Sequence, residues 1–151
     1  MNARETLHEE VLERLNRTVI DAADFFASAD ESMSDGRQTA HGILSQLVFW
    51  HKQYVDIAAA LLRGDAPKLK AGAFDKFNQI ARNSYAGYSM TMLAYDLSCL
   101  QKEFDALVRQ LPDWSINFPI KSDSEPRSLS ERLAEIDQHI RQHVVRLQRG
   151  Q

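Results

Sequence analysis

Five histidines are the residues of this sequence best suited to metal or proton chemistry: His8, His41, His51, His139 and His143. Imidazole binds divalent metal ions and also exchanges protons near neutral pH. His139 and His143 are four residues apart, and on a helix this spacing places two rings roughly 6 Å apart, within reach of one metal ion. Such a site needs at least one further ligand from another helix.

The single cysteine, Cys99, excludes an internal disulfide framework and a cysteine-cluster zinc site. Any metal bound by this chain therefore has to be held by imidazole rather than by thiolate. A lone thiol in an apolar helical segment is expected to be a small core residue. The sequence also contains no glycine-rich phosphate loop and no nucleophile elbow.

The composition is that of a globular domain without a strong charge bias. The chain has 151 residues, of which 44% are hydrophobic, and a formal net charge of −3. A domain of this length buries roughly 70% of its unfolded surface, so it needs no metal merely to fold. Positive and negative side chains are nearly equal in number, so the chain lacks the positive field that general binding to a phosphate backbone requires. With no long apolar stretch and no apolar signal segment, we expect a bacterial cytoplasmic protein without a membrane partner.

Hydrophobic periodicity predicts helices rather than strands. Residues 4–27 and 37–63 each carry apolar residues at helical spacing. A third helix is expected from about residue 72 to residue 110, where Gly87 marks either a bend or a close helix contact. Residues 113–127, which contain two prolines, are expected to form a long loop.

The last predicted helix begins with a capping box, Ser128 to Glu131, and ends at Gly150. Four amphipathic helices and no strand pattern predict an all-α four-helix bundle, with residues 1–151 as one domain. A broad apolar face on two of these helices would also suit a homodimer.

The histidine pair lies on or beside the core face of this last helix. With Ile136 at zero on a helical wheel, His143 lies about 20° away and His139 about 60° away on the same side. Two buried imidazoles without partners are costly, so this placement favours a role for the pair as ligands.

Two histidines of the second helix are candidates for the third ligand. Relative to Leu44, His41 lies about 60° away, and His51 lies about 20° away on the opposite side. They are about 15 Å apart along the axis, so only one can join a mononuclear site. On periodicity alone His51 is the better buried, and it could equally be a core histidine bonded to a neighbour. The choice stays open at this level.

Two segments resemble the DinB/YfiT-like superfamily. Gly36–Trp50 is similar to the second helix of that family, which opens with a polar turn, a small or apolar residue and a histidine. The His139–His143 pair matches the family's H-x-x-x-H on the fourth helix, in the same order and at a similar separation. The resemblance covers nearly the whole chain. It implies a divalent-metal site of His41, His139 and His143 that holds zinc, nickel or iron.

The resemblance also implies an activity. In members of the superfamily the ion is thought to activate a low-molecular-weight thiol, such as bacillithiol or mycothiol, for transfer to an electrophile. The expected function is therefore a metal-dependent transferase or hydrolase acting on a small electrophilic molecule.

A second branch of the superfamily suggests an alternative. Leu61–Pro67, Phe74–Ile80 and Trp50 resemble ClbS/DfsB-like members, some of which act on a reactive toxin without the full histidine triad. The alternative function is a bundle that binds or sequesters a small molecule without turnover. A third view is a structural or interaction bundle whose histidines bind nothing.

Overall fold

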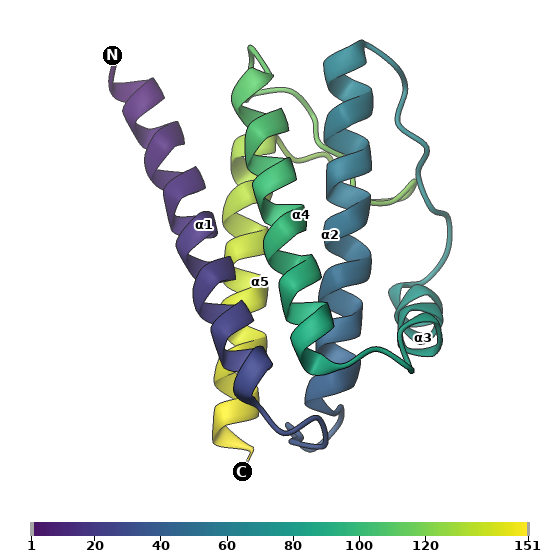
Figure 1. Cartoon of the computed structure of the whole chain (residues 1–151). Helices are drawn as coiled ribbons and strands as arrows, with labels where there is room; N and C mark the ends of the chain where they lie inside the picture. The colour runs from purple at the N-terminus through teal and green to yellow at the C-terminus, as the bar shows by residue number, and fades with distance from the viewer. Residues whose placement is uncertain (1, 151) are drawn as a thin grey trace.

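The bundle consists of four long helices and one short helix. The computed structural model describes residues 2–150, and within this range it contains no β-strand beyond two isolated bridges. The helices are α1 (Ala3–Ser28), α2 (Ala40–Arg63), α3 (Phe74–Ser84), α4 (Met90–Gln110) and α5 (Leu129–Arg149). The long helices lie side by side, and α3 lies apart from them beside α2 (Figure 1). The predicted all-α architecture is confirmed, with one helix more than expected.

The expected continuous helix over residues 72–110 is wrong, because the chain breaks between α3 and α4. The Ser89 side chain accepts a hydrogen bond from the Met92 amide, at 3.1 Å. A serine at this position satisfies an otherwise free amide and begins a new helix. Gly87 lies in the turn before it. The break leaves α3 against α2, while α4 returns along the bundle in contact with α1 and α2.

The other helix boundaries follow their capping residues. The second helix begins at Ala40 instead of residue 37, because the Thr39 side chain caps it by accepting from the Gly42 amide. It ends at Gly64, which adopts a left-handed conformation with φ of 79°. The predicted capping box of Ser128 and Glu131 is present at the start of α5.

The loop between α4 and α5 is fixed to the bundle at several points. Phe118 is fully buried and packs against Phe104 of the core. Trp114 stacks on His8 of α1, with ring centroids 4.6 Å apart. The Lys121 ammonium donates to the Gly72 carbonyl, which ties this loop to the segment between α2 and α3. These contacts hold the loop against α1, α4 and the segment between α2 and α3.

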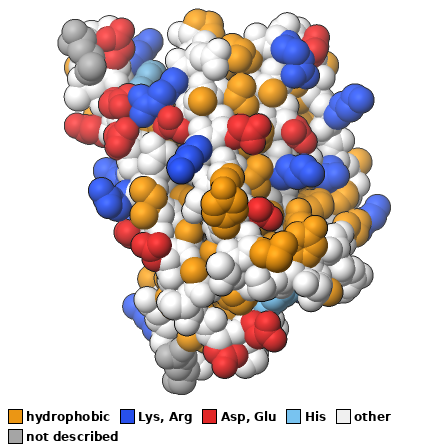
Figure 2. Space-filling model, in the orientation of Figure 1, with side chains coloured by type: hydrophobic (Ala, Val, Ile, Leu, Met, Phe, Trp, Pro, Cys, Tyr) orange, Lys and Arg blue, Asp and Glu red, His pale blue; other side chains and the backbone are white. Residues whose placement is uncertain are grey.

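The outer face of α4 carries apolar side chains. Tyr88, Met92 and Tyr95 are exposed, and Figure 2 shows hydrophobic side chains over the middle of the molecule, where α4 faces the viewer. Cys99 is also exposed, so its expected core position is wrong. The homodimer stays a prediction. Among residues 2–150, no helix combines the length and the apolar character that a membrane crossing requires.

The packing of α1 can be tested with two identical substitutions on that helix. Leu12 is fully buried in the core, whereas Leu7 is 60% exposed. We expect Leu12→Ala to lower the free energy of unfolding by about 2–5 kcal/mol, since it leaves a cavity, and Leu7→Ala to change it by less than about 0.5 kcal/mol. Urea unfolding measures both values. Equal losses would contradict the assigned face of α1.

Candidate functional site

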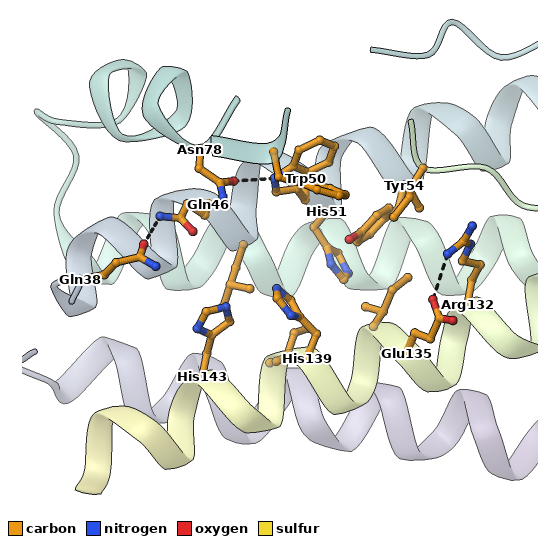
Figure 3. Close-up of a pocket in the computed structure, with 15 residues that line it drawn as sticks. Gln38, Gln46, Trp50, His51, Tyr54, Asn78, Arg132, Glu135, His139 and His143 are labelled. Atoms are coloured by element: carbon orange, nitrogen blue, oxygen red, sulfur yellow. Dashed lines mark hydrogen bonds and ion pairs between the residues drawn. The ribbon is translucent and has the colours of Figure 1, made fainter. Parts of the chain in front are cut away.

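A cavity of about 460 Å³ lies between α2 and α5. Its walls are completed by Phe74 and Asn78 of α3 and by Ile120 of the α4–α5 loop. Figure 3 shows side chains from α2 and α5 pointing toward one another across it. The remaining lining residues are Gln38, Gln46, Leu47, Trp50, His51, Tyr54, Arg132, Glu135, Ile136, His139, Ile140 and His143. The cavity is therefore mainly apolar, with polar groups at defined places, which is the usual character of a small-molecule site.

The predicted histidine pair lies in this cavity. The rings of His139 and His143 are 4.5 Å apart between centroids and nearly perpendicular, at 83°. His143 is buried, whereas His139 reaches solvent at the edge of the cavity. The Nδ1 atom of His143 is buried and has no hydrogen-bond partner among residues 2–150. An unpaired buried polar atom is costly, so this nitrogen differs from the other buried polar atoms of the structure.

The surroundings lower the pKa of both rings and so favour their neutral form. Burial is the main cause that lowers the pKa of His143 to about 4, and the neighbouring His139 and Arg146 lower it further. The pKa of His139 is also lowered, by desolvation first and by Arg146 second. Neutral imidazole offers one N–H donor and one acceptor nitrogen. The neutral pair can therefore both donate and accept hydrogen bonds.

Two amide side chains face the histidine pair from the other side of the cavity. Gln46 of α2 donates a hydrogen bond to Gln38, and both lie opposite His143 (Figure 3). Sequence reasoning missed Gln46, because glutamine is ordinarily a solvent-facing helix residue. Here it is 5% exposed. This end of the cavity consequently presents amides and neutral imidazoles.

His41, the third predicted ligand, does not join the pair. Its Nε2 atom lies 2.8 Å from the Tyr88 carbonyl oxygen, so the ring donates to the turn between α3 and α4. It is absent from the cavity lining. Over residues 2–150, no group of three or more His, Cys, Asp or Glu side chains is arranged to hold a metal ion. The pair fits two coordination positions, but His41 does not fit the third, so we derive no chemical step through a metal.

His51 occupies the position that the wheel assigned to a core histidine. It is 1% exposed, and its Nε2 atom lies 2.7 Å from the Gln101 Oε1 atom of α4. Burial lowers its pKa to about 4, although the hydrogen bond with Gln101 acts in the opposite direction. His51 also lines the cavity. It is thus both a core residue and a wall residue of the site.

An aromatic wall forms the side of the cavity nearest α3. The indole N–H of Trp50 donates to the Asn78 Oδ1 atom at 2.8 Å, which fixes the orientation of the ring. Phe74 and Phe77 pack on the same indole, with centroids 5.2 and 6.0 Å away. Trp50 lies on α2 and Asn78 on α3, and the break before α4 is what allows α3 to bring Asn78 to the cavity.

The comparisons with known proteins identify no relative. No protein-family model, no curated protein and no solved structure matches this chain.

The neutral state of His143 leads to a prediction about acid stability. In the unfolded chain this ring titrates near 6.5, whereas in the folded protein its pKa is about 4. Between these values the unfolded chain binds the proton first, so the free energy of unfolding should decrease as the pH falls from 6.5 to 4. Urea unfolding at pH 7 and pH 4.5 should show a smaller decrease for His143→Gln than for the wild type. His51 contributes a similar decrease to both proteins.

Gln142→Ala is the matched control, because Gln142 is an exposed neighbour on the same helix. This variant should keep the wild-type pH dependence. A pH dependence that is the same in His143→Gln as in the wild type would contradict the burial of a neutral ring at this position.

Proposed function

We propose that this protein binds a small, mainly apolar molecule in the cavity between α2 and α5. The observation that carries the proposal is a cavity of about 460 Å³ that combines aromatic and aliphatic walls with a few polar side chains, among them His143, whose Nδ1 atom has no hydrogen-bond partner among residues 2–150. Apolar surface supplies the binding free energy, and a few fixed polar groups orient the ligand. The ligand then carries an uncharged hydrogen-bonding group that lies against His143 and His139.

The resemblance to ClbS/DfsB-like proteins is consistent with this proposal. The segments that carry it contribute Trp50, Phe74 and Asn78, which form one wall of the cavity. We therefore propose a DinB-like bundle of this type that captures a small reactive molecule. Capture requires no third metal ligand, and so it does not depend on the position of His41.

A second candidate is a divalent-metal-dependent transferase or hydrolase acting on a small electrophile. It is favoured by the 4.5 Å separation of the His139 and His143 rings and by the free nitrogen of His143. A zinc, nickel or iron ion held there would supply Lewis-acid chemistry. In this second candidate the two histidines supply two of the ligands, a further ligand other than His41 completes the site, and the same cavity binds the electrophile.

The binding proposal can be tested with N-phenyl-1-naphthylamine, an uncharged aromatic dye. In a Trp114→Phe background, Trp50 is the single tryptophan and reports on the cavity. We expect the dye to bind and to receive excitation energy from Trp50. Leu47→Phe fills the cavity and should weaken binding by about tenfold or more, since overpacking at this site displaces ligand volume.

Leu7→Phe is the control, because it makes the same substitution at an exposed position of α1. It should leave the affinity for the dye unchanged, and circular dichroism checks that both variants fold. Absence of dye binding to the wild-type protein, or equal affinities of the wild-type and Leu47→Phe proteins, would overturn the proposed site.

The metal candidate has a separate test. Zinc added to tag-free protein should bind through the histidine pair, so His139→Ala should abolish binding and His41→Ala should leave it intact. Equilibrium dialysis with metal analysis measures both. No zinc bound by the wild type overturns the candidate. Loss of binding in His41→Ala would instead restore the three-histidine site that the family resemblance implies.

A further inference from the structure

His51 is the start of a chain of hydrogen bonds that runs from the cavity through the bundle to the opposite surface. Its Nε2 atom contacts Gln101 at 2.7 Å, and the Gln101 amide contacts Asn16 of α1, also at 2.7 Å. Asn16 contacts the Asp105 carboxylate at 2.9 Å. Asp105 in turn forms an ion pair with Arg109 at 2.9 Å. Three helices, α1, α2 and α4, thus contribute to one continuous polar path.

The carboxylate at the far end determines the direction of every hydrogen bond in this chain. Asp105 is paired with Arg109 and can only accept, so Asn16 has to offer its NH₂ group to it. The Asn16 carbonyl oxygen then accepts from the NH₂ group of Gln101. The Gln101 carbonyl oxygen is left for the His51 ring, which must donate from Nε2.

This direction determines the tautomer of His51. A neutral ring that carries its proton on Nε2 has an unprotonated Nδ1, which is a hydrogen-bond acceptor. Because Nε2 is occupied by Gln101 and the residue lines the cavity, Nδ1 is the nitrogen available to a ligand. Figure 3 shows the ring pointing from α2 into the space between α2 and α5.

We propose that His51 is a specificity-determining residue that accepts a hydrogen bond from an O–H or N–H group of the bound molecule. Gln101, Asn16 and Asp105 are positioning residues, because they act only through the tautomer of His51. This inference rests on the proposed binding function and narrows the ligand class to molecules with a hydrogen-bond donor. Molecules of the same shape without a donor leave the acceptor nitrogen unpaired and bind more weakly.

The tautomer can be measured without any ligand. Long-range ¹H–¹⁵N NMR of the histidine rings, with His51 assigned by its absence in His51→Gln, should show the proton on Nε2 in the wild type. Asp105→Asn replaces a carboxylate, which can only accept hydrogen bonds, with an amide that can also donate. The side-chain amides of Asn16 and Gln101 can then reverse their orientation, so a fraction of His51 should carry its proton on Nδ1. Glu103→Gln, an exposed acid on the same helix, is the matched control and should not change the spectrum. A proton on Nδ1 in the wild type, or identical tautomer populations in Asp105→Asn, would overturn the inference.

The preference for a donor is tested with N-phenyl-1-naphthylamine and its N-methyl derivative, which lacks the N–H group. The wild type should bind the N–H compound about fivefold or more tightly. This preference should disappear in His51→Phe/Gln101→Leu, in which both partners of the first hydrogen bond are replaced by apolar groups so that neither is left unpaired. Equal affinities in the wild type, or a preference that persists in the double variant, contradict the role of His51. Failure of both compounds to bind contradicts the proposed function itself, whereas the tautomer measurement tests the polar chain independently of binding.

Discussion

The burial of α2 on nearly every side is the constraint on which the site depends. This helix contacts α3, α4 and α5, and 14 of its 24 residues are buried, including the seven consecutive residues 42–48. A helix in this position brings polar side chains inside together with apolar ones, and each of them needs a partner. Gln46, Trp50 and His51 find partners on three different structural elements. The cavity lies between α2 and α5, and these two helices make few direct contacts with each other.

The buried polar groups of the bundle divide into two kinds. Those of the His51–Gln101–Asn16 chain satisfy one another and end at a charged pair on the surface. Such a network is stable because each donor has an acceptor, and it also fixes the orientation of every member. His143 differs, since no hydrogen bond of its ring is found among residues 2–150 and its Nδ1 atom is buried without a partner there. A buried nitrogen left unpaired while its surroundings are satisfied is unusual in a packed core.

The sequence predicted the parts of this structure that depend on local chemistry. The capping box at Ser128 and the inward placement of His143 follow from short-range rules, and both are observed. The break before α4 could have been predicted from Ser89, but the helical periodicity on both sides concealed it. Gln46 could not have been predicted, because a helical wheel divides residues between core and solvent, and α2 has no solvent face over residues 42–48.

The same limitation explains why the histidines of α2 could not be ranked. The helical wheel places His51 about 20° and His41 about 60° from the core direction, which indicates the better-buried residue but not the partner of either ring. The turn between α3 and α4 supplies a carbonyl for His41, whereas α4 supplies an amide for His51 beside the cavity. A carbonyl contact uses the ring of His41 to hold two segments together. Both rings keep an acceptor Nδ1 atom, but only His51 lines the cavity, so the histidine that packs best in the core is also the one whose chemistry reaches the site.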